Sequence, residues 1–221
     1  MISERSGYIM DEKKIKVITK VLGSVSTNCY FIINVLTKDT IIIDPADSPV
    51  TIESVISENG LKPKAILLTH GHFDHILAAK QIKEEFKIPI IACDKEKNLI
   101  ENSRLNLSAS FGERVELQVD EYVQDGKILD IAGFSIKVIH TPGHTEGSTC
   151  YYFPDEDTLI SGDTLFCESV GRSDFPTGSS SQLIRSIKEK LLILPEKTIV
   201  FPGHGDSTTI EYEKKNKPFC K

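Results

Sequence analysis

The feature that most constrains the fold is a short apolar run that ends in a cluster of potential metal ligands. The run KAILL, residues 64–68, predicts a buried strand, and it leads directly into THGHFDH, residues 69–75. This second segment holds three of the six histidines in the chain. Because α/β sheets bind ligands beyond the carboxyl ends of their strands, the sequence predicts a site at that edge of a sheet.

Strand and helix patterns alternate along the chain. Short runs rich in Ile and Val, bounded by Gly, Asn, Pro or Asp, predict strands, and apolar residues at helical spacing predict helices. The predicted strands cover residues 14–23, 28–35, 39–46, 64–70, 88–94, 114–120, 127–133, 134–141, 148–155, 158–166 and 197–205. The predicted helices cover residues 48–60, 75–86 and 179–195. We therefore expect an α/β fold in which two sheets pack face to face with helices outside both.

Length and composition indicate one ordinary globular domain. The chain has 221 residues, of which 39% are hydrophobic and 26% are charged, and it contains no linker or repeat. We expect a single domain over residues 14–221, without an added helical C-terminal domain, after a disordered N-terminus over residues 1–13. The net charge of -6 argues against nucleic acid as a partner.

The cysteines and the N-terminus predict the compartment. Five dispersed cysteines without a CxxC pair indicate reduced thiols. The first residues are too polar for a signal peptide, and no apolar run approaches the length of a membrane span. We expect a cytoplasmic protein without a membrane partner, present as a monomer or homodimer.

The segment HGHFDH has the composition of a metal-binding loop. Imidazole nitrogen and carboxylate oxygen are the usual ligands of hydrolytic zinc. His70 and His72 are separated by one small residue, so both can face one point, while Asp74 and His75 can face a second point where a helix begins. Four potential ligands in six residues exceed the need of one ion and suggest two metals that share a bridging ligand.

Three later residues complete this set. His144 in TPGHT would join His70 and His72 in what we call metal site one. His204 in FPGHG would join Asp74 and His75 in metal site two. Asp163 in SGDTLF has two carboxylate oxygens and could bridge both ions. The seven predicted ligands are therefore His70, His72, Asp74, His75, His144, Asp163 and His204.

Together these motifs resemble a known family. THGHFDH, HTPGHTEGS, SGDTLF and FPGHG, in this order, are similar to the metallo-β-lactamase fold superfamily of metal-dependent hydrolases. The segment SVGRSDFPTGSSSQLIRSI and the closing PGHGDSTTIEYEKKNKPF resemble glyoxalase II, the hydroxyacylglutathione hydrolase, and its short bacterial relatives. The resemblance extends over nearly the whole chain.

The resemblance implies a fold, a cofactor and a reaction. The fold would be an αββα four-layer sandwich of two mixed sheets with helices on both outer faces. The seven ligands would hold two divalent ions, for which we expect zinc, with iron or manganese as alternatives. A metal-bridging hydroxide would attack the carbonyl of a small thioester, S-2-hydroxyacylglutathione or a similar compound, with Asp74 and Asp163 as the catalytic carboxylates.

Two departures from relatives narrow this expectation. Full-length glyoxalase II continues after the last His motif into a helical domain that binds glutathione, and this sequence has no residues that match it. The β-lactamases of the superfamily have cysteine at the position of Asp163, which argues against β-lactam hydrolysis as the main activity.

Other functions stay open. One is a persulfide dioxygenase, a relative that shares a GR-x-DF segment and would hold a single iron on His70, His72 and His144. Another is lactone hydrolysis on the same fold. A nuclease is disfavoured because the chain has no basic surface or inserted arm, and a degenerate binding protein is disfavoured because all seven ligands are present.

Four further polar residues have expected roles outside the ligand set. Asp44 in IIIDPAD could orient a ligand histidine or begin the turn before Pro45. His140 is expected to be a hydrogen-bonded group near the ligands and not a ligand itself. Arg172 and Asp174 could shape the substrate edge or form a structural ion pair.

Overall fold

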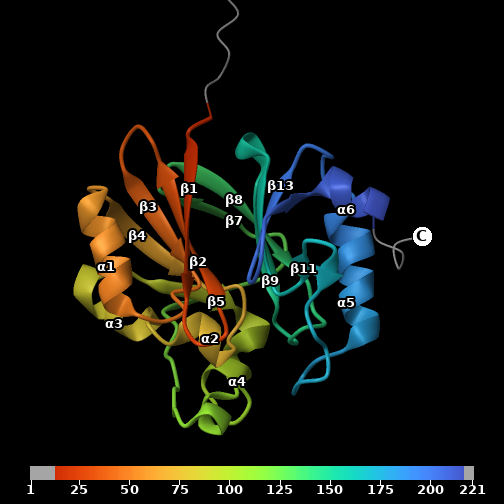
Figure 1. Cartoon of the computed structure of the whole chain (residues 1–221), viewed down its shortest axis with the longest axis horizontal. Coiled ribbons are helices and arrows are strands. Elements are labelled where there is room, and N and C mark those ends of the chain that lie inside the picture. The colour runs from red at the N-terminus through yellow and green to blue at the C-terminus, as the bar shows by residue number, and fades with distance from the viewer. Residues whose placement is uncertain (1–12, 217–221) are drawn as a thin grey trace, which may run out of the picture.

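The computed structural model describes residues 13–216, so the predicted disordered N-terminus lies outside the described residues except for Lys13. Two six-stranded mixed sheets pack together in this range (Figure 1). The prediction of one domain over residues 14–221 stays a prediction.

The first sheet is built by the N-terminal half of the chain. Its order is β1-β2-β3-β4-β5-β6, antiparallel from β1 to β3 and parallel from β3 to β6. Its strands are β1 Ile15–Leu22, β2 Thr27–Asn34, β3 Asp39–Ile43, β4 Lys62–Leu67, β5 Ile90–Cys93 and β6 Glu121–Val123.

The second sheet is built by the C-terminal half. Its order is β14-β13-β10-β9-β8-β7, and only β10 and β13 are parallel to each other. Its strands are β7 Ile128–Ile131, β8 Phe134–His140, β9 Thr149–Phe153, β10 Thr158–Gly162, β13 Ile199–Pro202 and β14 Thr208–Thr209. A separate hairpin pairs β11 Leu165–Phe166 with β12 Ser169–Val170.

Helices cover the outer face of each sheet. Figure 1 shows α1 and α3 on the outside of the first sheet and α5 and α6 on the outside of the second. The helices are α1 Pro49–Glu58, α2 Phe73–Ile76, α3 Ala79–Phe86, α4 Lys97–Ile100, α5 Ser180–Ser186, which continues as a π-helical turn Ile187–Leu191, and α6 Ile210–Asn216. The predicted four-layer αββα sandwich is confirmed.

Side-chain alternation along the central strands separates three apolar layers. In β2, Cys29 and Phe31 pack toward the helices of the first sheet, whereas Tyr30 and Ile32 pack between the sheets. In β9, Tyr151 lies between the sheets and Tyr152 faces α5. Successive residues of a strand point to opposite faces, so strands buried on both faces are apolar at nearly every position.

Three predicted elements are wrong. The predicted strand over residues 158–166 is divided into β10, in the second sheet, and β11, in the separate hairpin. Residues 114–120 form no strand, because Val115 bonds through its amide to Ser108 and through its carbonyl to Asn106. The predicted helix over residues 75–86 is divided into α2 and α3. At the break, the amide of Ala78 donates to the carbonyl of Pro45, 3.0 Å away, which removes it from the helical hydrogen-bond ladder.

Candidate metal centre

The seven predicted ligands meet at the edge where both sheets end. The segment from His70 to His75 follows β4 of the first sheet. The other three ligands come from the second sheet: His144 lies in the loop after β8, Asp163 directly follows β10, and His204 follows β13. Residues far apart in the sequence are therefore brought together because the strands before them run toward one edge.

Metal site one brings three imidazoles into contact. Nδ1 of His72 lies 2.9 Å from Nε2 of His144, which in turn lies 3.2 Å from Nε2 of His70. All three side chains are buried. The three nitrogen atoms face a common point, as three ligands of one ion must.

The protonation of this cluster suits a metal. Burial and the neighbouring histidines lower the pKa of His70 and of His72 well below the ordinary value, so both are neutral at pH 7. Nδ1 of His144 lies 2.7 Å from the carbonyl oxygen of Arg172 and donates its hydrogen there, which leaves Nε2 with a lone pair. Metal ligation requires neutral imidazoles with a free lone pair.

Metal site two combines two imidazoles with a carboxylate. Oδ2 of Asp74 lies 3.4 Å from Nε2 of His75 and 3.4 Å from Nε2 of His204. The hydroxyl of Thr27 in β2 donates to the same Oδ2 over 2.7 Å and fixes its position.

Asp163 lies between the two sites. Its Oδ1 is 3.5 Å from Nε2 of His75, and its Oδ2 is 3.4 Å from Nε2 of His144 and 3.5 Å from Nε2 of His204. One carboxylate therefore faces ligands of both sites, which is the position that a bridging ligand occupies.

The chemistry of these atoms fits a cation. Nδ1 of His75 donates to Asp44, so a neutral His75 carries only a lone pair on Nε2. This Nε2 atom and Oδ1 of Asp163 are buried, face each other and have no hydrogen-bond partner. Buried acceptors that converge without a donor are costly unless a positive charge lies among them. The donor set is therefore suited to divalent ions.

The electrostatics of metal site two lead to the same conclusion. Burial alone would lower the pKa of His75, but the carboxylates of Asp74, Asp163 and Asp44 outweigh it and raise the pKa to about 10. Burial would raise the pKa of Asp74, yet His75, His204 and Thr27 hold it below its usual range. The excess of negative charge attracts a cation to this place.

Asp44 orients a predicted ligand, His75, which is one of the two roles that the sequence predicted for it. It is fully buried at the end of β3, and its Oδ2 lies 2.8 Å from Nδ1 of His75. The amide and hydroxyl of Thr69 donate to the two Asp44 oxygens over 2.8 and 2.6 Å. The Asp44 carboxylate, itself fixed by Thr69, therefore sets the tautomer of His75.

Glu96 is a functional residue that the sequence reasoning missed. Its buried carboxylate accepts hydrogen bonds from the amide of Gly71, over 2.9 Å, and from the hydroxyl of Thr145, over 3.0 Å. Gly71 separates His70 from His72, and Thr145 follows His144. Glu96 therefore ties together the two loops that form metal site one. Its only signal in the sequence was a glutamate just after an apolar strand.

The glycine before His204 is required by close packing. A Cβ atom on Gly203 would lie 2.0 Å from Oδ1 of Asp163 and 2.9 Å from Cε1 of His75. The backbone before His204 thus passes directly behind the bridging carboxylate, and only glycine fits there.

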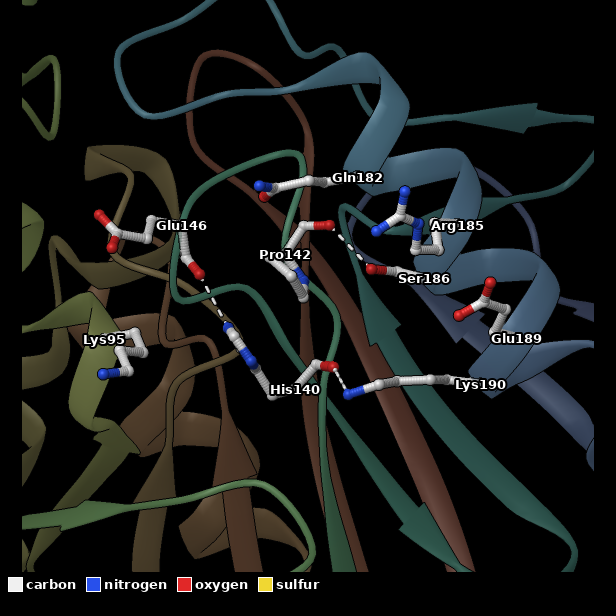
Figure 2. Close-up of a pocket in the computed structure, with 9 residues that line it drawn as sticks. All are labelled: Lys95, His140, Pro142, Glu146, Gln182, Arg185, Ser186, Glu189 and Lys190. Atoms are coloured by element: carbon white, nitrogen blue, oxygen red, sulfur yellow. Dashed lines mark hydrogen bonds between the residues drawn. The ribbon is translucent and has the colours of Figure 1, made fainter.

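His140 lies next to a different hollow. A cavity of about 380 Å³ between α5 and the loop after β8 is lined by His140 and Pro142, with charged side chains of both signs such as Arg185 and Glu189 (Figure 2). Nε2 of His140 lies 2.8 Å from the carbonyl oxygen of Glu146, in the loop that carries His144. His140 is thus a hydrogen-bonded group near the ligands, and this cavity contains none of the seven ligands.

A second cavity, of about 260 Å³, opens over the metal centre. Five predicted ligands reach it: His72, Asp74, His144, Asp163 and His204. Arg172 also lines it and forms a two-point ion pair with exposed Asp174, at 2.9 and 2.7 Å. Both predicted roles apply to this pair: it lies at the edge of the pocket, and its two side chains form an ion pair with each other. We refer to this cavity as the metal-site pocket.

No helix within residues 13–216 is both long enough and apolar enough to cross a membrane.

Comparison with known solved structures places the fold. BLEG-1, described as a B3 metallo-beta-lactamase, superposes with a TM-score of 0.89 at 39% identity, over 93% of this chain and 100% of that chain. TTHA1623 in a di-iron-bound form gives 0.82 at 34% identity, over 92% and 100%. ETHE1 from Myxococcus xanthus gives 0.74 at 27% identity, over 92% and 83%.

Comparison of sequences gives the family. The probable metallo-hydrolase YqgX of Bacillus subtilis is 40% identical over 200 residues, 90% of this chain and 94% of that protein. The hydroxyacylglutathione hydrolase GloC of Haemophilus influenzae is 36% identical over 185 residues, 82% of this chain and 87% of that protein. The family model of the metallo-beta-lactamase superfamily matches residues 22–204. This match and these relatives show that the chain belongs to the metallo-beta-lactamase superfamily and is a metal-dependent hydrolase.

Proposed function

We propose that this protein hydrolyses a small thioester, S-2-hydroxyacylglutathione or a close analogue, with two divalent metal ions, most simply zinc. The observation that carries the proposal is the position of Asp163, whose two oxygens face the histidines of both metal sites. Similarity to the hydroxyacylglutathione hydrolase GloC supports the choice of thioester.

Each residue of the centre has a defined task in this reaction. His70, His72 and His144 would hold one ion, and Asp74, His75 and His204 the other, with Asp163 between them. When bound, the metals would supply a water with a pKa near 7 and polarise the substrate carbonyl.

The remaining groups position these ligands. Thr27 holds one oxygen of Asp74, and Asp44 keeps the hydrogen of His75 on Nδ1, so that Nε2 stays a lone-pair donor. Asp74 and Asp163 both line the metal-site pocket and can accept a hydrogen bond from a water held there.

The pocket suits a leaving group that needs no proton. Among residues 13–216, Arg172 is the one titratable side chain besides the predicted ligands that lines it, and a guanidinium is a poor proton donor at neutral pH. A thiol has a pKa of about 8.5, so a thiolate can leave without a general acid. This favours a thioester over a substrate whose leaving group must be protonated.

Metal analysis followed by a thioesterase assay tests the proposal. Purified protein should contain two metals per chain and hydrolyse S-lactoylglutathione, and Asp74→Ala should abolish turnover. Asp155→Ala, at an exposed position remote from the centre, is the matched control and should keep both metals and full activity. Two bound metals without turnover of any thioester would contradict the proposal.

A mononuclear-iron persulfide dioxygenase is the alternative proposed from the sequence. It predicts one iron per chain and oxygen consumption with glutathione persulfide, whereas the hydrolase predicts neither. Lactone hydrolysis is tested with the same protein on a simple lactone.

Hydrolysis of β-lactams is a second candidate because BLEG-1, described as a B3 metallo-beta-lactamase, is 39% identical to this chain. The sequence analysis disfavours this activity, because this chain has Asp163 where the β-lactamases of the superfamily have cysteine. A chromogenic cephalosporin decides between them: hydrolysis faster than that of S-lactoylglutathione would make the β-lactam the preferred substrate.

We also propose that the protein acts in the cytoplasm, on a small molecule, as a monomer or homodimer. The support is that Cys29, Cys93, Cys150 and Cys167 are all free thiols, which is usual in reducing compartments. Thiol titration of protein purified without reductant tests the reduced state of the cysteines. The mass of the protein in solution tests whether it is a monomer or a homodimer.

A further inference from the structure

We propose that the metal-site pocket selects thioesters whose acyl group is apolar and bears a ring, in preference to small polar acyl groups such as lactoyl. This inference rests on the proposed thioester hydrolysis and specifies its substrate class. It follows from the side chains that surround the ligands.

Outside the predicted ligands, the described residues that line the pocket are all apolar except Arg172. Its lining consists of the five predicted ligands, Arg172 and six apolar side chains. The six apolar side chains are Val25, Phe73, Leu107, Phe111, Phe166 and Phe175. A pocket of this kind gains binding free energy by removing apolar substrate surface from water.

The aromatic rings are arranged around both metal sites. Phe73 and Phe111 stack with their centroids 4.3 Å apart. Phe175 meets the ring of His72 edge to face at 5.6 Å, and Phe166 meets the ring of His204 at 6.0 Å. A substrate carbonyl at the metals would therefore place its acyl substituent among rings, which favour contact with another ring.

The wall formed by Leu107 and Phe111 is built into the fold. Leu107 has a φ of 70°, a left-handed conformation that is costly for a branched side chain, and such strain is concentrated at functional sites. The preceding Asn106 is fully buried, and its carbonyl accepts the amide hydrogen of Phe73 over 2.9 Å. Its side chain donates to the carbonyl of Val115 over 2.7 Å. The loop is thus attached to the helix that bears Asp74.

The charge at the pocket edge does not favour an acidic acyl group. In the part of the chain that the structure describes, Arg172 is the one cationic side chain of the lining outside the ligands, and Asp174 already accepts two hydrogen bonds from it. The guanidinium also lies over the ring of Phe175, 4.0 Å from its centroid. An acyl carboxylate would compete with Asp174 and would repel it.

A pair of substrates that differ only in the acyl substituent tests the inference. S-mandeloylglutathione and S-lactoylglutathione share the thiol and the α-hydroxyl group, but mandeloyl has a phenyl ring where lactoyl has a methyl group. With zinc-loaded protein we expect kcat/KM for the mandeloyl ester to exceed that for the lactoyl ester by about tenfold or more, the size of discrimination that apolar pockets achieve.

Binding of the two acids provides a readout independent of turnover. Calorimetry on zinc-loaded protein should give a Kd for mandelate about tenfold lower than that for lactate. If neither ester is hydrolysed, the proposed thioesterase function fails, and the ratio of the two Kd values still decides whether the pocket prefers a ring.

Substitutions at Phe111 test whether this ring causes the preference for the mandeloyl ester. Because this ring is 57% exposed, its removal leaves the core intact. Phe111→Ala should reduce the mandeloyl-to-lactoyl ratio about tenfold, and Phe111→Leu should fall between Phe111→Ala and the parent protein. Leu36→Ala, which removes another exposed apolar side chain from the turn between β2 and β3, should leave the ratio unchanged.

The opposite results are equally clear. A ratio near one for both kcat/KM and Kd in the parent protein would overturn the inference, as would a preference for lactoyl. A mandeloyl preference that survives Phe111→Ala, with the melting temperature unchanged, would overturn the assignment of this wall.

Discussion

Oδ2 of Asp44, at the end of β3, lies 2.8 Å from Nδ1 of His75, and both side chains are buried. The pair sets which nitrogen of His75 faces Asp74 and Asp163. Binding of an ion at metal site two would therefore depend on Asp44, a residue outside the set of seven predicted ligands.

Replacing Asp44 by Asn should weaken metal site two specifically. Loss of a partner that orients a ligand histidine reduces metal affinity by about 10- to 100-fold. Competition with a chromogenic chelator should show one weakened site and one unchanged site. Asp39→Asn, the same change in a partly exposed ion pair at the other end of β3, should leave both sites intact. Equal weakening of the two sites would contradict the role of Asp44.

The buried carboxyl of Glu96 should make the metal-free protein less stable as pH rises. Burial raises its pKa to about 7 from an ordinary value of 4.5, although hydrogen bonds from Gly71, Thr145 and Gly147 act in the opposite direction. Between these pH values the folded state binds more protons than the unfolded state, so the free energy of unfolding falls, by on the order of 3 kcal/mol in total.

Urea unfolding of chelator-treated protein at pH 5 and pH 8 measures this dependence. Glu96→Gln should lose it, whereas Glu101→Gln, an exposed neighbour at the end of α4, should keep it. Parallel pH profiles for Glu96→Gln and the parent protein would show that Glu96 does not titrate in this range.

Removing the metals should destabilise the whole protein. Chelation removes the divalent charge that the converging carboxylates of Asp74 and Asp163 would share. An ion present at a thousand times its Kd stabilises the folded state by about 4 kcal/mol, which corresponds to a decrease in Tm on the order of 10 °C for a chain of this size. Calorimetry with and without chelator tests this, and added zinc should restore the original Tm. An unchanged Tm would mean that the seven side chains hold no ion.

Gly203→Ala should remove metal binding through packing alone. The new Cβ atom would lie 2.0 Å from Oδ1 of Asp163, so the carboxylate must move. We expect fewer than two metals per chain by elemental analysis. Gly126→Ala is the control, because Gly126 has a φ of 79° and nothing within 4 Å of the added Cβ atom. That variant should cost about 1 kcal/mol in backbone strain and keep both metals.

Local patterns in the sequence predict the ligand set and most strands. Four of the ligands, His70, His72, Asp74 and His75, are neighbours in one loop. Their spacing in the sequence is therefore enough to predict that they lie close together. The apolar runs of β2, β3 and β4 predict buried strands for the same reason. Their packing into two sheets with outer helices also follows, since each sheet must cover two apolar faces.

Contacts between distant segments explain what the sequence does not reveal. Glu96 and Thr27 act on residues far along the chain, so no local pattern identifies them. Residues 114–120 alternate like a strand, but side chains of the preceding loop bond both backbone groups of Val115. The break between α2 and α3 depends on the carbonyl of Pro45, which a helical pattern cannot anticipate.

The division of the ligands between the two sheets has a consequence during synthesis of the protein. His70, His72, Asp74 and His75 leave the ribosome more than a hundred residues before His204. At a usual elongation rate this delay lasts on the order of ten seconds. During that time Asp74 and His75 lack His204, their partner in metal site two. Metal site two can form only after β13 has joined its sheet, so the filling of this site marks the end of folding and not its beginning.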